Sequence, residues 1–281
     1  MDLGKLFADM HIHSVYSDGT CTLEEICDLA ADHNVGVISV TDHNCISGVK
    51  SLFPIAKARG IKCIPGAELD SLYNGNTCHI LAYGFNPDDI FLNKLARENK
   101  DTLIEADKHT LSRIAKAYSL ELSQYDEFVY DEKKGGWRLI QFLVNQGITD
   151  SMDEAVKIMK EYKDKVLFPD ARGVIDVIHK ASGVAILAHP GETFHVDEAI
   201  DEGTIGRIMD LIGYGLDGIE CYYPRHKRGL EKVLCDICQE NNLYITSGSD
   251  YHGEFFRNSK QNIGCEFKRV QDLQLKNLLN Y

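Results

Sequence analysis

Short apolar runs alternate with amphipathic stretches of helical length along most of the chain. The runs are rich in Val, Ile and Tyr, which are typical of buried strands. The stretches between them repeat their apolar positions with the period of a helix. The pattern predicts strands at residues 7–13, 35–40, 61–65, 77–83, 184–188, 218–222 and 243–246.

The helices between these strands have recognisable ends. Thr22-Leu-Glu-Glu25 is a capping box that begins a helix extending to about Asn34. A second helix is predicted over residues 47–59, with Pro54 in its first turns or at a kink and Gly60 at its end. Further helices are predicted over residues 172–180, 197–213 and 228–241, and a terminal helix from Val270.

The pattern changes between about Asp88 and Val166, where the strand signals stop and the sequence becomes long, charged and helical. Helices are predicted over residues 89–118 and 137–146, and Ser151-Met-Asp-Glu154 caps a third. Because strand and helix alternate on both sides of this segment, it is interpreted as a helical insertion in a parallel α/β barrel or barrel-like sheet. The expected division is a first barrel part (1–87), a helical insertion domain (88–166) and a second barrel part (167–281).

The composition is that of a compact globular protein. Of the 281 residues, 44% are hydrophobic, 26% are charged and only 6 are Pro, which excludes disordered and collagen-like chains. The apolar runs are shorter than the ~20 residues that a membrane span requires. The first residues lack the pattern of a secretory signal. We therefore expect a cytoplasmic protein that does not bind membranes.

Charge and cysteine content restrict the classes of partner and of cysteine chemistry that we expect. The formal net charge of -13 argues against binding of duplex nucleic acid. It allows a small anionic substrate, because bound metal ions can reverse the potential inside a cleft. The nine cysteines are scattered apart from Cys235 and Cys238, and an odd number without a signal peptide indicates reduced thiols. This pair lies on one face of a predicted helix, so packing is preferred over metal binding.

Histidines and acidic residues gather on and after the predicted strands. Asp9, His11 and His13 alternate on the first strand, so their side chains point to the same side and the two imidazoles can share a metal ion. In a parallel barrel the C-terminal ends of the strands meet at one face, which holds the active site. Most of the other candidates fall there: Asp18, His43, Glu68, His79, His189, Asp250 and His252.

This set indicates a metal centre. It combines six of the eleven histidines with three carboxylates and no cysteine, and such ligands suit Zn, Mn or Fe(II). The ligands are too many for one ion, so two or three divalent ions are predicted. His33, His109 and His179 lie on predicted helices and are interpreted as ordinary polar residues.

Six short motifs resemble, in order, those of the polymerase and histidinol phosphatase (PHP) family. They are Asp9-Met-His-Ile-His13, Ser17-Asp-Gly19, Thr41-Asp-His-Asn44, Gly66-Ala-Glu68, Ala188-His-Pro190 and Ser249-Asp-Tyr-His252. The resemblance implies a distorted (β/α)7 TIM-like barrel, and the helical insertion is similar to that of the TrpH/YciV-like branch. That branch cleaves phosphate esters of small nucleotides such as 3',5'-bisphosphates, and some members trim short RNA from the 5' end.

The resemblance also implies a ligand arrangement. One ion would be held by His11, His13, Glu68 and Asp250, a second by Glu68, His79 and His189, and a third by Asp18, His43 and His252. The implied reaction is hydrolysis of a phosphate ester by a metal-bridging hydroxide, since clustered ions lower the pKa of bound water toward ~7.

Candidate substrate contacts follow the strand at 218–222. Arg225 is predicted to bind a phosphate with Lys227, the adjacent tyrosines to stack on a base, and His226 to protonate the leaving group. The alternative is a solvated basic loop before the next helix. Arg138, beside Trp137, is a candidate phosphate ligand from the insertion. The remaining candidates for substrate contacts are Arg172, Arg257 and His195, and those for orienting the ligating imidazoles are Asp9 and Asp42.

Two alternatives to a nucleotide phosphoesterase stay open. A histidinol-phosphate-type phosphomonoesterase would use the same fold and metals, although the helical insertion argues against it. A metal-dependent amidohydrolase also begins with His-x-His on its first strand. That class typically adds a metal-bridging lysine and lacks the Thr-Asp-His and Gly-x-Glu elements present here. The expected partner is a phosphorylated small molecule, either a nucleotide or a short single-stranded oligonucleotide.

Overall fold

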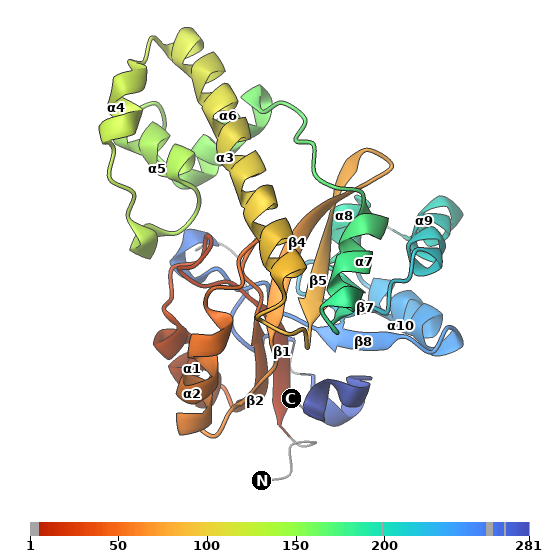
Figure 1. Cartoon of the computed structure of the whole chain (residues 1–281). Helices are drawn as coiled ribbons and strands as arrows, with labels where there is room; N and C mark the ends of the chain where they lie inside the picture. Colours follow the sequence, from red (N-terminus) through yellow and green to blue (C-terminus); the bar gives the residue numbers. More distant parts are fainter. Residues whose placement is uncertain (1–5, 198, 257–260, 267, 281) are drawn as a thin grey trace.

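The computed structural model describes residues 6–197, 199–256, 261–266 and 268–280. Its strands lie in the lower part of Figure 1, with helices around them and a helical lobe in yellow and green above. The lobe contains α3 to α6, and the barrel is formed by the segments before and after it.

The first half of the barrel is parallel. β1 (Phe7–Ile12), β2 (Val35–Val40) and β3 (Lys62–Cys63) form a sheet in the order β1-β2-β3. Two helices, α1 (Leu23–Asp32) and α2 (Val49–Ala58), connect these strands and pack against them. The capping box that predicts α1 is confirmed, because the Thr22 hydroxyl accepts from the Glu25 amide and the Glu25 carboxylate accepts from the Thr22 amide.

The second half contains an antiparallel hairpin that the strand pattern does not predict. The five-stranded sheet has the order β4 (Gly66–Tyr73), β5 (Asn76–Tyr83), β6 (Val184–Leu187), β7 (Gly218–Tyr222) and β8 (Tyr244–Ser247). β5 is antiparallel to both β4 and β6, whereas β6, β7 and β8 are parallel. The expectation of a fully parallel barrel is therefore wrong at β5.

The reason lies in β4 and its turn. The carboxylates of Glu68 and Asp70 interrupt the apolar pattern by which a buried strand is recognised. The two-residue turn between β4 and β5 is Asn74-Gly75, and both residues have positive φ, 48° and 73°. Asn-Gly between two strands is a strong hairpin signal, because both residues of a type I′ turn need positive φ.

The two sheets meet at both edges. His43, after β2, forms a parallel bridge with Glu68 of β4, and Ile12 of β1 bridges with Tyr251, which follows β8. These contacts connect the two sheets, as in the distorted barrel that the motifs imply. The helices on the second half are α7 (Ala171–Lys180), α8 (Pro190–Thr193), α9 (Glu202–Gly213) and α10 (Leu230–Glu240).

The prediction of a terminal α-helix is wrong. The structure has short 3-10 turns at Val270–Asp272 and Lys276–Asn280. The backbone between these turns pairs with the barrel, where the Gln274 amide donates to the carbonyl of Ile245 at 3.3 Å. This pairing competes with a continuous helix. The helix predicted from residue 197 also begins later, at Glu202, because the Asp201 carboxylate caps it there.

The helical lobe has a hydrophobic core of its own. It comprises α3 (Ile90–Tyr118), α4 (Leu122–Glu127), α5 (Arg138–Asn145) and α6 (Met152–Tyr162), with the predicted Ser151 cap in place. Phe142 and Leu143 of α5 are fully buried in this core, and Phe255 from the barrel also packs into it. The beginning of α3 belongs to the barrel core instead, since Leu92 and Leu95 pack there.

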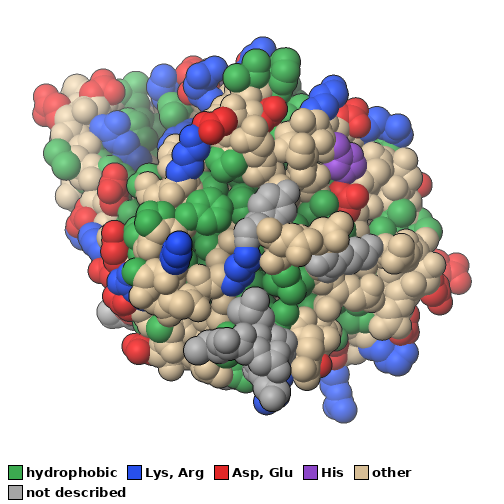
Figure 2. Space-filling view, turned by 60° about the horizontal axis from the view of Figure 1, so that its bottom comes forward, with side chains coloured by type: hydrophobic (Ala, Val, Ile, Leu, Met, Phe, Trp, Pro, Cys, Tyr) green, Lys and Arg blue, Asp and Glu red, His purple; other side chains and the backbone are tan. Residues whose placement is uncertain are grey.

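Figure 2 shows the molecule turned so that the bottom of Figure 1 comes forward, and acidic and basic side chains are interspersed over this view. Within the described part of the chain, every helix is too short or too polar to cross a membrane.

A substitution in the lobe tests whether residues 88–166 form a separate domain. Phe142→Ala is expected to cost about 3–5 kcal/mol of unfolding free energy, because it empties space between buried rings. Tyr125 and Phe128 contact this ring at 5.1 and 5.7 Å between centroids. Hydrogen exchange is expected to accelerate in α5 and α6 and not in β1 or β7. Phe85→Ala, in the barrel core, is the matched control with the opposite distribution. Equal acceleration throughout the chain in Phe142→Ala would contradict a separate domain.

Candidate metal centre

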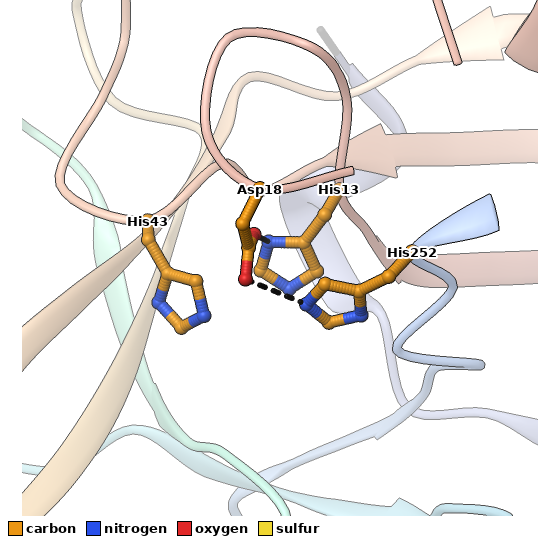
Figure 3. Close-up of side chains that lie close together, drawn as sticks. All are labelled: His13, Asp18, His43 and His252. Carbon is orange, nitrogen blue, oxygen red and sulfur yellow. Dashed lines mark ion pairs between the residues drawn. The ribbon is translucent and has the colours of Figure 1, made fainter. Parts of the chain in front are cut away.

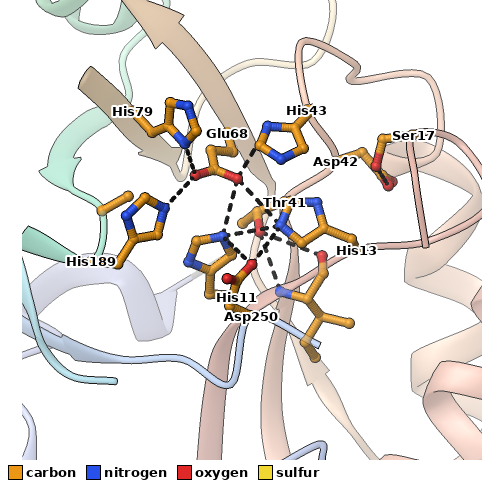
Figure 4. A network of polar contacts seen from close by, with 12 residues as sticks. His11, His13, Ser17, Thr41, Asp42, His43, Glu68, His79, His189 and Asp250 are labelled. Carbon is orange, nitrogen blue, oxygen red and sulfur yellow. Dashed lines mark hydrogen bonds and ion pairs between the residues drawn. The ribbon is translucent and has the colours of Figure 1, made fainter. Parts of the chain in front are cut away.

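The nine predicted ligands converge at the end of the barrel that faces the lobe. Most of their side chains are labelled in Figure 4, where they point toward one another from β1, β4, β5 and the loops after β2, β6 and β8. Asp18 and His252 are shown in Figure 3. His11, His13, Asp18 and Glu68 have no exposed surface, and His43 and His79 are partly exposed. The set therefore lies at the bottom of a cleft with one open side.

Glu68 lies at the centre of the set. Its Oε2 is 3.2 Å from Nε2 of both His11 and His13 and 3.3 Å from Nδ1 of His43. Its Oε1 is 2.9 Å from His79 Nδ1 and 3.0 Å from His189 Nε2. One carboxylate thus faces imidazoles on both sides.

Two of the implied ligand groups share this carboxylate. His11, His13, Glu68 and Asp250 offer ligand atoms that all lie within 4.8 Å of one another, and so do Glu68, His79 and His189. In the first group, Asp250 Oδ1 is 3.2 Å from Nε2 of His13. Because Glu68 directs one oxygen to each group, it has the geometry of a bridging ligand.

A third group adds His13 to the three residues that the family resemblance implies. It consists of His13, Asp18, His43 and His252, shown in Figure 3. Asp18 Oδ2 is 3.3 Å from His252 Nε2, and Asp18 Oδ1 is 3.6 Å from His13 Nδ1. His13 directs Nε2 to the first group and Nδ1 to this one, so its imidazole lies between them.

Orphaned polar atoms test whether these residues fit metal ions. Within the described residues, His13 Nδ1 and both carboxylate oxygens of Asp18 are buried and have no hydrogen-bond partner. Such groups are costly to bury unless an ion or another partner satisfies them. The donor set of imidazole nitrogens and carboxylate oxygens is one that Zn, Mn and Fe(II) accept. The residues therefore fit divalent metal ions.

The charges explain why the site needs cations. Burial alone lowers the pKa of imidazoles, but the carboxylates outweigh it here. They raise the pKa of His13 to about 10, mainly through Asp250 and Glu68, and the pKa of His79 to about 9 through Glu68. Burial alone raises the pKa of Glu68, yet His43 and His11 hold that pKa well below its usual value. The raised pKa values of His11, His13 and His79 favour protons on these imidazoles beside the buried carboxylates, whereas burial lowers the pKa of His43.

Two of the predicted ligands lie on strained backbone. His189 has φ 27° and Asp250 has φ 52°, a region that residues other than Gly rarely adopt. The His189 amide donates to Glu220 Oε2 at 2.8 Å, and the Asp250 amide donates to the His11 carbonyl at 2.8 Å. Each such residue costs on the order of 1–3 kcal/mol, which the surrounding structure must offset. The strained conformations direct both side chains into the cluster.

Sequence reasoning missed Glu220 of β7. Its carboxylate is fully buried and lies 3.0 Å from His11 Nδ1. A carboxylate that accepts from the outer nitrogen of a ligating imidazole fixes the tautomer and orientation of the ring. The available signal was an acidic residue inside the apolar run 218–222, because Glu is almost never fully buried without a partner.

The two acids expected to orient imidazoles do something else. Asp9 accepts from the backbone amides of Ser249 at 2.9 Å and Gly264 at 2.7 Å, and from the amide of His11 rather than its ring. Asp42 accepts from the amide and hydroxyl of Ser14 and from the Ser17 hydroxyl. Both carboxylates therefore hold the loops that carry the ligands.

The structure places three predicted substrate contacts elsewhere. Arg138 Nη2 donates to the carbonyls of residues 125, 126 and 128, so its guanidinium fastens the lobe instead of facing the cluster. His226 Nδ1 donates to the Cys221 carbonyl and its Nε2 accepts from the Gly191 amide, and burial lowers its pKa. Both ring nitrogens are thus engaged, which does not suit a general acid. Arg172 stacks on Tyr214, 4.2 Å from the ring centre.

The tyrosines after β7 also differ from the prediction. The Tyr223 hydroxyl donates to Asp250 Oδ2 at 3.0 Å, so this buried residue supports a ligand instead of stacking on a base. Tyr222 lies under the ammonium group of Lys268. Lys227 is exposed, and Arg257 lies outside the described residues.

Arg225 is the predicted cation that the structure brings to the site. It lines a cavity of about 540 Å³ over the cluster, together with His195, Trp137 and Lys160. Its Nη2 is 3.4 Å from Asp250 Oδ2 and its Nε is 3.3 Å from Glu192 Oε1. A guanidinium at this place can meet an anion that approaches the cluster.

The histidines interpreted as ordinary polar residues lie outside the cluster. His33 Nδ1 donates to the Ile263 carbonyl, and His179 Nε2 is 2.7 Å from Asp217 Oδ2. The nine cysteines are free thiols, and Cys238 packs with its Sγ 3.7 Å from that of Cys221. The pair Cys235 and Cys238 is therefore accounted for by helix packing.

Known proteins share both the sequence and the fold. The sequence profile of the PHP domain family matches residues 9–215. A phosphoribosyl 1,2-cyclic phosphate 1,2-diphosphodiesterase from Eggerthella lenta is 25% identical over an alignment of 274 residues, and the alignment covers 90% of this chain and 96% of that protein. A 3',5'-nucleoside bisphosphate phosphatase from Chromobacterium violaceum is 26% identical over an alignment of 260 residues. This alignment covers 87% of this chain and 86% of that protein.

A solved structure supports the same relationship. The structure of a protein from Bifidobacterium adolescentis, named as a metal-dependent phosphoesterase, has a TM-score of 0.77 at 21% identity, and the match covers 91% of each chain. The match shows that the two chains share one overall fold. Because the family profile spans residues 9–215 of 281, the chain belongs to the PHP domain family.

Proposed function

We propose that this protein is a metal-dependent phosphoesterase that hydrolyses phosphate esters of small nucleotides, such as 3',5'-bisphosphonucleotides, or of short oligonucleotides. The observation that carries the proposal is the sharing of Glu68 between two groups of buried ligands, with Asp18 and its imidazoles forming a third group beside them. Two or three divalent ions, Mn, Zn or Fe, are the expected cofactors.

The ions would be held as the ligand groups indicate. His11, His13, Glu68 and Asp250 form one set, and Glu68 forms a second with His79 and His189. When bound, such ions offset the negative charge of a phosphate ester and lower the pKa of bound water toward ~7.

Side chains of the protein itself orient the ligands and bind the substrate. Glu220 and Tyr223 hold His11 and Asp250 in place from the protein side. Arg225, at the edge of the cavity, is suited to bind the phosphate, and its planar guanidinium can donate two parallel hydrogen bonds to phosphate oxygens.

A second arm of the cleft supports a substrate with an organic group. A cavity of about 440 Å³ extends from His43 and His79 to the space between barrel and lobe. Its lining there is largely apolar and includes Leu103, Val156, Met159 and Phe168. Trp137 and Lys160 line both arms, so an aromatic face and a cation are available next to the cluster.

The two alternative functions, a histidinol-phosphate-type phosphomonoesterase and an amidohydrolase, have less support. The apolar arm and the bisphosphate phosphatase among the relatives favour a nucleotide over histidinol phosphate. The cyclic phosphate diphosphodiesterase among the relatives makes phosphodiesters a further class to assay. An amidohydrolase typically has a bridging lysine, and Glu68 takes the central position here. The nine free thiols favour a cytoplasmic location, and we expect neither duplex nucleic acid nor a membrane as a partner.

Activity is expected to depend on metal and on His11. Phosphate release should stop after chelation and return with Mn²⁺, and His11→Ala should lower kcat/KM by at least about 10²–10³-fold, because it removes a buried ligand of the shared site. The measurement is phosphate release with both proteins reloaded in parallel. His109→Ala, an exposed histidine of α3, is the control that should leave the rate unchanged. Full activity of chelated wild type would rule out the metal mechanism.

Substrate preference can be measured on a small panel. Adenosine 3',5'-bisphosphate is expected to be hydrolysed with a kcat/KM at least about tenfold above AMP and histidinol phosphate, a difference of ~1.4 kcal/mol in transition-state binding. A cyclic phosphodiester belongs in the same assay. Preference for histidinol phosphate, or silence on every ester with metal confirmed bound, would refute the nucleotide assignment.

Metal uptake is expected to strengthen as the pH rises. Burial lowers the imidazole pKa, but the neighbouring carboxylates raise it to about 10 for His13 and about 9 for His79, so metal must displace protons at neutral pH. Each displaced proton weakens the apparent affinity by about tenfold per unit of decreasing pH. Calorimetry of Zn²⁺ binding in buffers of different ionisation enthalpy measures the released protons. An affinity that stays constant from about pH 8 to pH 6 would contradict this explanation.

A further inference from the structure

The side chain opposite His79 in the hairpin carries an inference that rests on the proposed metal centre. We propose that Asp70 is a positioning residue that makes His79 present Nδ1 to the ligand group of Glu68 and His189, and that Asn44 and Asn99 hold Asp70 in this position. The helix α3, which continues from the barrel core into the lobe, then braces a metal ligand of the barrel through Asn99.

The antiparallel register creates the contact. Asp70 of β4 and His79 of β5 are directly paired residues, so their side chains lie on the same face of the hairpin. Glu68 lies two residues before Asp70 and therefore shares that face. His79 is placed between the two carboxylates, with Nδ1 2.9 Å from Glu68 Oε1 and Nε2 3.1 Å from Asp70 Oδ1.

Asp70 is itself fixed by Asn44. The Asn44 side-chain amide donates to Asp70 Oδ2 at 2.6 Å, and the Asp70 amide donates to Asn44 Oδ1 at 3.1 Å. The Asn44 backbone amide donates to the Glu68 carbonyl, and its φ of 47° is one that Asn adopts more readily than most residues. The loop after His43 is thereby bound to the strand that carries Glu68 and Asp70.

Asn99 extends the arrangement to α3. Its side-chain nitrogen donates to Asn44 Oδ1 at 3.0 Å and to the Asp70 carbonyl at 2.7 Å. Asn99 is 1% exposed although it lies on a helix with many charged residues. Because this buried side-chain nitrogen donates both of its hydrogen bonds, Asn99 can support the metal site rigidly.

The chemical consequence concerns the tautomer of His79. A metal ligand must be a neutral imidazole with a free lone pair, and a carboxylate at the other nitrogen keeps the proton there. Asp70 therefore leaves Nδ1 free on the side of Glu68 and raises the basicity of the ligand. His43, Asp70 and His79 also lie close enough to hold an ion themselves. The Asn44 donor on Asp70 Oδ2 argues against this alternative, and the metal count distinguishes the two.

The test is a zinc titration of the metal-free protein against a chromophoric chelator, with elemental analysis of the loaded protein. Asp70→Asn keeps the size of the side chain, but its single oxygen cannot serve both Asn44 and His79. We expect one zinc ion to bind about 10–100-fold more weakly while the others keep their affinity. Asn99→Ala should weaken the same ion to a smaller extent. Asn93→Ala, an exposed asparagine on the same helix, is the matched control and should leave every affinity unchanged.

A spectroscopic readout separates positioning from a purely structural role. In the zinc-loaded protein labelled with ¹⁵N-histidine, the imidazole signal that disappears in His79→Gln is expected to show a protonated Nε2. In Asp70→Asn this signal should change or broaden, while the signals of the other ligands persist. Should Asp70→Asn fail to fold, the comparison of Asn99→Ala with Asn93→Ala decides.

The outcomes are distinct. Unchanged zinc affinities in Asp70→Asn, or a His79 protonated at Nδ1, would overturn the positioning role and leave the proposed function intact. Loss of one complete zinc ion in Asp70→Asn, with the His79 tautomer preserved, would identify Asp70 as a ligand instead. A wild-type protein that binds no zinc would overturn both proposals.

Discussion

The buried carboxylate of Glu68 is the constraint on which the architecture depends. A carboxylate removed from water is tolerated only where positive charge contacts it closely. Here five imidazoles lie within 3.3 Å of its two oxygens. They come from β1, from β5 and from the loops after β2 and β6, so the barrel has to bring distant segments to one point. The strained backbone at His189 shows that the fold accepts unfavourable local conformations to achieve this.

Much of this centre is predictable because its signals are local. The alternation of His11 and His13 on one strand, and the histidines that follow later strands, are visible in the sequence, and strand-end placement brings them together. Glu220 could not be paired with His11 in this way, since 209 residues separate them. The main structural feature that the strand pattern does not predict is the hairpin of β4 and β5. Reading Asn74-Gly75 as a turn would have placed Glu68 on a strand beside His79.

Residue type alone predicts the wrong role for a residue where tertiary contacts determine the direction of its side chain. Arg138 and His226 have the chemistry of phosphate binding and acid catalysis. Their polar atoms are nevertheless taken by backbone groups of the lobe and of the β7 and α8 loops. Arg225 differs because its partners are carboxylates at the open edge of the cavity. The lobe itself is tied to the barrel at several places, including the Gly136 amide, which donates to the carbonyl of Asp18 at 2.7 Å. It therefore completes the walls of the cleft and also supports its floor.

The contact between the two ends of the chain has a consequence for biosynthesis. Asp250 and His252 follow the last strand, and the Asp250 amide donates to the carbonyl of His11 on the first. A ribosome releases His11 and His13 long before the residues that complete their ligand groups. Until Asp250 and His252 have emerged, the nascent chain presents His11 and His13 without the two later residues of their ligand groups. Because β1 then has to pair with segments from the far end of the sequence, closure of the barrel is a late, long-range folding event. The ligand groups of His11 and His13 are therefore assembled only after the segment that follows β8 has joined β1.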